Sequence, residues 1–398
     1  MKLSEKLIEG LLKFSGSVSI IVILLITVFL FKEGLGIFNN PVVENGYTLC
    51  LNPSNPVDKL TSYQIKEIFD YEITNWKDLG GKDLEIRPFR FDEIFNIYSD
   101  EELGENYGLL SEKLAEEIEQ DQSVIAFIPD KYVLNDAGKL KVLSTGTISF
   151  NDFFGGKEWM PTSTPSAQFG ALPLISGTLW VSFFAILIAL PLGLGVAIYM
   201  SELSTERVRK LMKPAIELLA GIPSVVYGFF GLIVLAPLIQ KVFNLPVGET
   251  AFAGSLILAI MALPTIITVA EDSIRNTPNA MREASLSLGA NQWQTIYKVV
   301  IPYASSGISA AVILGIGRAI GETMAVLMVT GNAAVIPRSL FEPVRTIPAT
   351  IAAELGEAPN GGTHYNALFL LGCILFLITL VMSIFAEMAS KKQQNKGI

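Results

Sequence analysis

The sequence predicts an all-α polytopic membrane protein with six transmembrane helices and a small α/β insert outside the membrane, between the first two helices. The first observation is composition: 51% of the 398 residues are hydrophobic and only 17% are charged, which is too apolar for a soluble protein of this length. The second is charge: residues 40–165 hold 23 acidic and 11 basic residues, a net of −12, against −9 for the whole chain. The remainder is mildly basic, so the acidic block is predicted to be a separate domain.

Six apolar runs are long enough to span the membrane. Crossing about 30 Å of hydrocarbon takes roughly 18 or more residues. The runs are Phe14–Phe31, a stretch within Phe169–Met200, Leu218–Gln240, Thr250–Ala270, Val299–Gly317 continuing past a charged pair to about Thr330, and Ala367–Ala386. No small-residue cleavage signal follows the first run, so we expect an uncleaved anchor.

Basic residues predict how these spans are oriented. They gather before the first run and in alternate gaps after it: Lys2, Lys6, Lys13, Arg207, Arg209, Lys210, Lys213, Arg275, Arg282, Lys298, Lys391, Lys392 and Lys396. Short loops rich in Lys and Arg stay in the cytoplasm. Both termini are therefore predicted to be cytoplasmic and the acidic block extracytoplasmic.

Strand and helix patterns alternate in the acidic block. "YTLCLNP" predicts a short strand, "SVIAFIP" a buried strand and "KLKVLS" an edge strand. "TSYQIKEIF" predicts an amphipathic helix capped by Thr61, and "GENYGLLSEKLAEEIEQ" predicts a second helix. About 100 residues suffice for one core, so this is a small α/β layer.

The fifth run contains two opposite charges, Arg318 and Glu322. At spacing i, i+4 they are predicted to share one helical face and to pair. Gly317 and Gly321 form a small-xxx-small row that lets another helix approach. An Arg at the bilayer centre costs about 2.5–3.5 kcal/mol, so two interpretations remain open. The pair is either a structural salt bridge, or a transient contact for an anion, whose oxygens suit the planar fork of Arg.

The cytoplasmic loop at about 273–302 predicts a helix–turn–helix outside the bilayer. Thr277 and Pro278 mark a helix start with Pro at the first helical position. Gly289 is expected to end this helix, and Asn291 to cap the next one with Gln294 three residues on. A short helix whose apolar face carries Met281, Ala284 and Leu288 fits a groove in another protein.

The stretch "EASLSLGANQWQTIYKVVIP" resembles the EAA loop of importer-type ABC permeases. The matching positions are Glu283, Ala284, Ser285, Gly289, Val299, Ile301 and Pro302, with Ser285 replacing the second Ala of the motif. The resemblance implies the type I ABC importer permease architecture and a loop that couples to ATPase subunits. The sequence holds no GxxxxGK[ST], so a partner must hydrolyse ATP and this chain is not expected to be an enzyme.

Further stretches resemble the PstC family of phosphate ABC transporter permeases. They include "GIPSVVYGFFGL", "LPTIITVAEDSIRNTPNAMREAS" and "GRAIGETMAVLMVTG". The resemblance implies that Arg318 and Glu322 line a phosphate pathway. It also implies a heterodimer with a PstA-like permease, two PstB-like ATPase subunits and an external PstS-like phosphate-binding protein, in the cell membrane. A permease for another oxyanion, such as sulfate or molybdate, and a membrane-anchored phosphate sensor or adaptor are the rival hypotheses.

Permeases of that family run almost directly from the first span into a stretch like "FFGGKEWMP", Phe153 to Pro161. We therefore expect three parts: residues 1–39, an insertion at 40–147, and a permease core at 148–398. "LTSYQIKEIF" and "ITNWKDLGGKD" make the insertion similar to part of a PstS-type binding protein. Where those proteins hold the anion with a Ser/Gly/Thr-rich loop, this chain reads "RPFRFDEIFNIYSDEE", leaving Arg87 or Arg90 as the possible ligand arginine. Docking of the binding protein is the preferred hypothesis; a structural cap and phosphate binding stay open.

No cofactor, metal or nucleic acid is expected. Cys50 and Cys373 fall in different parts of the pattern, without CxxC or Cys/His clusters. His364, beside a loop, is interpreted as an interfacial or capping residue. No basic footprint suggests nucleic acid.

Overall fold

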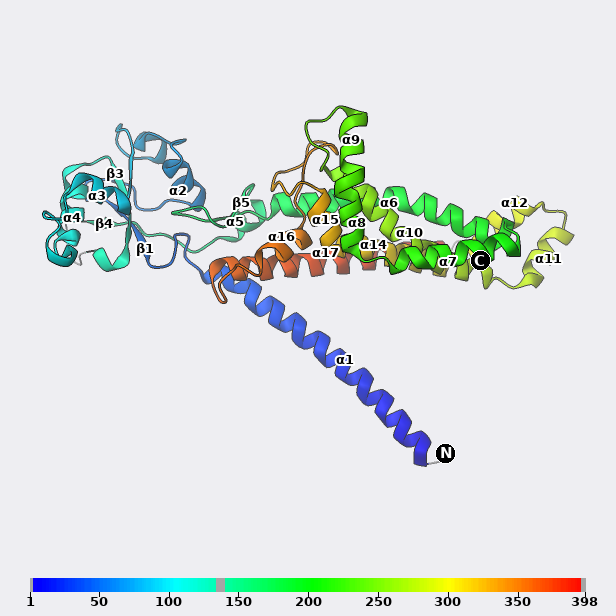
Figure 1. The fold of residues 1–398 in the computed structure, drawn as a ribbon. Coiled ribbons are helices and arrows are strands. Elements are labelled where there is room, and N and C mark those ends of the chain that lie inside the picture. Colours follow the sequence, from blue (N-terminus) through cyan, green and yellow to red (C-terminus); the bar gives the residue numbers. More distant parts are fainter. Residues whose placement is uncertain (1–2, 134–139, 395–398) are drawn as a thin grey trace. The chain divides into compact units, whose positions relative to one another are not determined.

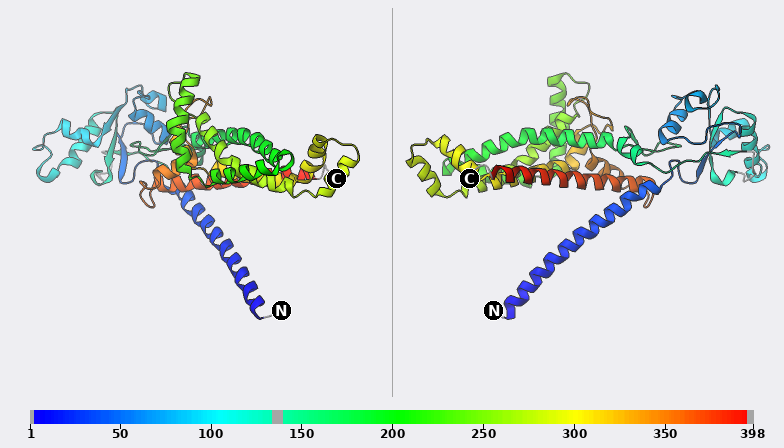
Figure 2. Two further views of the ribbon diagram at one scale, coloured as in Figure 1. Left: turned by 45° about the vertical axis from the view of Figure 1, so that its right-hand side comes forward. Right: turned by 180° about the vertical axis from the view of Figure 1, so that it is seen from behind.

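The computed structural model describes residues 3–133 and 140–394, which form two compact units (Figures 1 and 2). One unit comprises Met1–Gly34 and Leu172–Ile398, and the other is Leu35–Ala171. The first is helical: α1 Leu3–Leu35, α6 Leu172–Ile198, α7 Glu206–Gly221, α8 Ser224–Phe230, α9 Ala236–Phe243, α10 Ala251–Arg275, α11 Asn279–Ser287, α12 Gln292–Thr295, α13 Ile301–Tyr303, α14 Ser305–Gly321, α15 Met324–Val329, α16 Ile347–Glu354 and α17 Thr363–Gln394.

Five helices in the described residues are long and apolar enough to cross a membrane: Glu9–Asn39, Leu172–Leu203, Ser224–Phe243, Ala251–Arg275 and Thr363–Phe385. A sixth span results if Gln292–Tyr303 and Ser305–Gly321, which meet at 71°, count as one. The predicted spans are thus present in outline. The third span was predicted to begin at Leu218, but in the structure it begins at Ser224. The helix is broken just before it because Pro223 disfavours helical backbone at the preceding residue.

The prediction of one continuous fifth span from Val299 to about Thr330 is wrong. The chain bends at Ala304, after α13, and α14 ends at Gly321, before the separate helix α15. Pro302 lacks the N–H that a continuous helix would use. At the second break Glu322 adopts extended backbone, with φ −71° and ψ 132°.

Helix α10 lies at the centre of the helical unit, between α6 and α14 (Figures 1 and 2). Its Ile266 packs between Gly193 of α6 and Gly315 of α14, where added Cβ atoms would lie 2.7 and 2.8 Å from Ile266. Larger side chains at either glycine would force the helices apart. The core therefore fixes α6, α10 and α14 as one packed group.

The end of α1 is attached to α17. The Sγ–H of Cys373 donates to the carbonyl oxygen of Leu30 at 3.3 Å, and a Cβ on Gly34 would lie 2.9 Å from the backbone of Leu370. The most apolar window of α1 has no buried residue in this chain. That exposure is typical of a helix that faces lipid or another subunit.

The second unit is built on a four-stranded sheet of order β2-β3-β1-β4. Strand β1 pairs antiparallel with β3 and β4, and β2 pairs parallel with β3. The elements are β1 Tyr47–Leu51, α2 Ser62–Phe69, β2 Arg87–Arg90, α3 Ile94–Ile97, α4 Leu110–Gln120, β3 Val124–Pro129, β4 Lys141–Val142, α5 Phe150–Gly155, β5 Trp159–Met160 and β6 Gln168–Phe169. The predicted strands and both helices are present, although the second helix begins later than predicted, at Leu110. Thr61 is the predicted N-cap of α2, and Gln64 completes a capping box that was not predicted.

This unit is wider than the predicted insert at 40–147. Ser166 is hydrogen-bonded to the hydroxyl of Ser62 at 2.9 Å and donates to the carbonyl oxygen of Val42 at 3.0 Å. Gln168 donates to the carbonyl oxygen of Ser62 at 3.1 Å. These buried contacts tie the segment after residue 147 to α2, which is why the compact unit extends to Ala171.

Candidate substrate pathway and coupling loop

Arg318 lies in the last turn of α14 and is half-buried. Its Nη1 donates to Oγ1 of Thr265 on α10, at 3.4 Å. Among the described residues, no carboxylate forms an ion pair with Arg318. The guanidinium therefore keeps most of its hydrogen-bonding capacity for groups outside this chain.

Glu322 does not pair with Arg318, so the predicted i, i+4 ion pair is wrong. Its Oε1 accepts hydrogen bonds from the backbone N–H groups of Thr323, at 3.1 Å, and Ala325, at 3.5 Å. The carboxylate satisfies the first amides of α15, where a negative charge also suits the helix dipole. The two residues stand on different elements because the helix ends between them.

Gly317 and Gly321 are both exposed, and a Cβ at either position would meet nothing within 4 Å. No helix of the described chain packs on them. Gly193 and Gly315, by contrast, do allow a neighbouring helix to approach closely. Packing of a partner's helix on Gly317 and Gly321 stays a prediction.

The loop predicted to be cytoplasmic has the expected helix–turn–helix form. Helix α11 ends at Ser287, and Gly289 follows its C-cap Leu288 with a φ of +87°, a conformation that glycine adopts without strain. Asn291 and Gln294 form the predicted capping box at α12. One detail differs: Pro278 is the N-cap of α11 and not its first helical residue.

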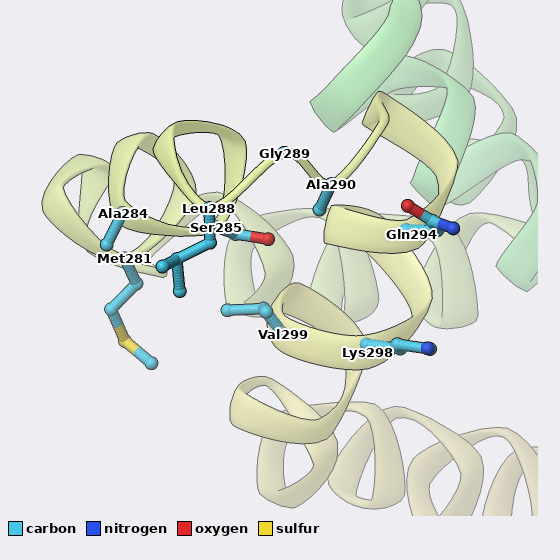
Figure 3. Close-up of a pocket in the computed structure, with 9 residues that line it drawn as sticks. All are labelled: Met281, Ala284, Ser285, Leu288, Gly289, Ala290, Gln294, Lys298 and Val299. Carbon is cyan, nitrogen blue, oxygen red and sulfur yellow. The ribbon is translucent and has the colours of Figure 1, made fainter.

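The loop has two arms, α11 before Gly289 and the helical segment with α12 after it. An open cavity of about 570 Å³ lies between these arms (Figure 3). Its lining includes the predicted apolar face, Met281, Ala284 and Leu288, together with Ser285, Gly289, Ala290, Gln294, Lys298 and Val299. Leu288 is 89% exposed. Glu283 and Pro302 are exposed and Ile301 is half-buried. An exposed apolar face at a concave surface is typical of a protein-docking site.

Sequence patterns did not predict the ion pair that joins the loop to the end of α6, or those that Glu354 forms with Arg345 and His364. Arg282 of α11 forms an ion pair with Glu202, at the cytoplasmic end of α6 by the predicted topology. Glu354 bridges Arg345, at 2.8 Å, and His364, at 2.9 Å, so the interfacial histidine is a helix-joining residue. The partners in these ion pairs are far apart in the sequence or lie on different elements, so no periodic spacing in the sequence indicates that they pair.

The two arginines of the second unit are bound to neighbouring groups. Arg87 forms ion pairs with Glu117, at 3.0 Å, and Asp121, at 3.3 Å. Arg90 donates to the hydroxyl of Thr164 at 3.2 Å and lies over the ring of Phe69. Neither is poised for an anion. In the part of the chain that the structure describes, no cluster of His, Cys, Asp or Glu could hold a metal ion.

Comparison with known proteins identifies the family. A family model described as "Binding-protein-dependent transport system inner membrane component" matches residues 189–395, more than half of the chain. The chain belongs to this family. Its members are components of transporters and not enzymes. A second model, "PBP superfamily domain", matches residues 28–91 of this permease.

Several curated relatives are similar over the permease core. A probable ABC transporter permease protein, YqgH of Bacillus subtilis, is 38% identical over 61% of this chain and 78% of its own length. The phosphate transport system permease protein PstC of Mesorhizobium japonicum is 42% identical over 66% of this chain and 84% of its own length. That of Pasteurella multocida is 39% identical over 64% and 84%.

Proposed function

We propose that this chain is a transmembrane permease subunit of an ABC importer for inorganic phosphate. The proposal is supported by the relatives named phosphate transport permeases. The observation that carries it is Arg318, a cation at the end of an apolar helix whose one hydrogen-bond partner in the described chain is a neutral hydroxyl. An intramembrane cation is costly unless something anionic meets it, and the guanidinium fork matches a tetrahedral oxyanion.

The partners follow from what this chain lacks. Its sequence has no phosphate-binding loop for ATP, so two ATPase subunits would serve the assembly, one of them docked at the cavity around Leu288 and Met281 of this chain. A second permease would complete the pathway beside Arg318, and an external binding protein would deliver phosphate. In this arrangement both termini are cytoplasmic, and closure of the ATPases opens the pathway outward.

The test is phosphate uptake by vesicles that contain the whole assembly, with Arg318→Gln beside wild type. Charge-assisted hydrogen bonds contribute about 1.5–3 kcal/mol, so uptake at low phosphate should fall roughly ten- to hundredfold. Arg338→Gln is the matched control, because Arg338 is exposed in a loop. Normal uptake by Arg318→Gln would leave Arg318 a structural residue only.

The same vesicles separate the rival functions. A phosphate permease should transport phosphate in the presence of excess sulfate or molybdate, whereas a permease for another oxyanion should be inhibited. A sensor or adaptor should show no ATP-dependent uptake of any of these anions. Uptake by wild type therefore decides between transport and sensing before any variant is measured.

For the second unit we propose docking of the external binding protein. Arg87 and Arg90 are satisfied by Glu117, Asp121 and Thr164, which does not favour phosphate binding. Phe95 and Tyr107, by contrast, are exposed, with ring centroids 5.6 Å apart, and Ile97 and Leu109 are exposed beside them in the sequence. Aromatic side chains of this kind are enriched at the centres of protein interfaces.

Point variants test this better than deletion of residues 41–146, which would strip α2 from the segment that holds Ser166. The double variant Phe95→Ser, Tyr107→Ser should weaken stimulation of ATP hydrolysis by the binding protein. Tyr63→Ser, another exposed aromatic of the unit, is the control. Equal stimulation in both variants would favour a structural cap.

A further inference from the structure

Glu202 and Arg282 join the cytoplasmic loop to the end of a membrane-spanning helix. Glu202 lies in a π-helical turn, Tyr199–Leu203, that continues α6. Its Oε1 accepts from Nη2 of Arg282 at 2.7 Å and its Oε2 from Nε at 3.3 Å. The side chains are only 9% and 18% exposed. A two-point, mostly buried contact of this kind fixes orientation as well as distance.

The same guanidinium also closes the end of α10. Nη2 donates to the carbonyl oxygen of Ile274 at 3.0 Å, and Nη1 donates to that of Thr277. Carbonyls at a helix C-terminus lack partners within the helix, so a cation there is favourable. Arg282 therefore contacts α6, α10 and its own helix α11 at once.

A second bond attaches the other arm of the loop to the same residue. Nε2 of Gln292 donates to the backbone carbonyl oxygen of Glu202 at 3.1 Å. The two arms are tied to each other by the hydroxyls of Ser285 and Thr295, 3.0 Å apart. The loop thus forms one body whose attachment to α6 is concentrated at Glu202.

Beyond Glu202, α6 and α10 connect this attachment to the intramembrane charge. Ile266 of α10 packs against Gly193 of α6, and its neighbour Thr265 contacts Arg318. Side-chain packing leaves no slack at Gly193, so the two helices must move together. A displacement of the loop would reach Arg318 through rigid elements.

We propose that Arg282 and Glu202 are positioning residues that transmit the movement of the cytoplasmic loop to α6 and α10. The proposal rests on the proposed function, because it needs an ATPase that moves the loop. It predicts that breaking this pair uncouples ATP hydrolysis from transport while leaving the docking face of α11 intact.

The first experiment measures phosphate taken up per ATP hydrolysed by the full assembly. Arg282→Gln and Glu202→Gln should each lower this ratio at least tenfold, and the double variant no further. Arg282→Lys keeps the charge but loses the fork, so it should be intermediate, and the exchanged pair Glu202→Arg, Arg282→Glu should recover part of the ratio. Glu206→Gln is the control, since its pair with Lys210 is exposed. An unchanged ratio, with uptake and hydrolysis falling together, would reduce the pair to a structural role.

The second experiment does not depend on phosphate. Spin labels at Ser287→Cys, on α11, and Leu203→Cys, in the turn that follows α6, report the distance between loop and helix in the assembly. When the contact between Glu202 and Arg282 is broken, the loop should move independently of α6. In wild type the distance between the two labels should be single and narrowly distributed, with and without ATP. In Arg282→Lys and Arg282→Gln the distribution of this distance should be broad or shifted. Narrow, unchanged distances in both variants would overturn the proposal even if the transported anion proved not to be phosphate.

Discussion

Nη1 of Arg318 and Oγ1 of Thr265 lie 3.4 Å apart, so a hydrogen bond joins α14 to α10 beside the tight contact of Gly315 with Ile266. The bond orients a guanidinium that has no carboxylate partner in the described residues. Thr265 is therefore placed to control the direction in which Arg318 presents its remaining donors.

Thr265→Val should raise the KM for phosphate about tenfold or more, with a smaller effect on maximal uptake. Valine keeps the shape of threonine but cannot accept the hydrogen bond, and hydrogen bonds to charged groups contribute about 1.5 kcal/mol or more. The measurement is the concentration dependence of uptake by vesicles. Thr265→Ser, which retains the hydroxyl, is the control. An unchanged KM in Thr265→Val would show that the hydroxyl does not orient Arg318.

Glu322→Gln should transport nearly as well as wild type, whereas Glu322→Ala should lose both stability and uptake. The amide oxygen of Gln can still accept from the N–H groups of Thr323 and Ala325, and loss of such a cap costs about 1 kcal/mol. Thermal unfolding and uptake of both variants are the measurements. If Glu322→Gln fails as fully as Glu322→Ala, the carboxylate charge itself is needed and the capping role is secondary.

Local signals in the sequence were enough for the elements with strong caps and periodicity. Thr61 with Gln64, Gly289, and Asn291 with Gln294 each mark a boundary through hydrogen bonds among near neighbours. Five of the apolar runs correspond to helices long enough to cross a membrane, because membrane thickness sets the length of such runs, whereas the fifth run is broken.

The candidate pathway could not be predicted in the same way. The spacing of Arg318 and Glu322 indicates a pair only if the helix continues, and its end at Gly321 depends on tertiary packing and on a side chain capping the next helix. The partners Thr265 and Glu202 lie 53 and 80 residues from Arg318 and Arg282. Such contacts leave no periodic signal in a single sequence.

Gly317→Leu tests whether a partner helix covers the exposed glycine row. A Cβ at Gly317 meets nothing within 4 Å in this chain, so the variant should fold as well as wild type by itself. In the assembly the larger side chain should prevent close approach of a second permease. Co-purification of the two permeases is the measurement, with Gly195→Leu as the control, since a Cβ there also meets nothing. Equal co-purification would place the interface elsewhere.

Cys50 should resist thiol-reactive reagents at pH 8 until the second unit unfolds. Burial of the Cys50 thiol is the main cause that raises its pKa from 9.0 to about 12, and the negative charge of Asp130 adds to it. Because only the thiolate reacts, the thiol of the folded protein is unreactive at pH 8. The folded unit therefore holds this proton more tightly than the unfolded chain does. The stabilisation that the protonated Cys50 thiol gives to the folded unit is complete below pH 9 and is lost as the pH rises toward 12. Labelling rates with and without denaturant test this, and rapid labelling of the folded protein at pH 8 would contradict it.

Leu288→Ser should weaken ATPase binding without destabilising the permease. The side chain is 89% exposed at the rim of the loop cavity, so folding of this chain gains little from it. Burying a leucine in a partner's groove contributes about 1.5–3 kcal/mol, which corresponds to a roughly ten- to hundredfold change in affinity. The measurement is the Kd of the purified ATPase for the permease in lipid nanodiscs, together with the Tm of each variant. Leu211→Ser on α7, 77% exposed, is the matched control. Equal affinities for the two variants would mean that the apolar face of α11 is not where the ATPase docks, because a contact centred on Leu288 must distinguish them.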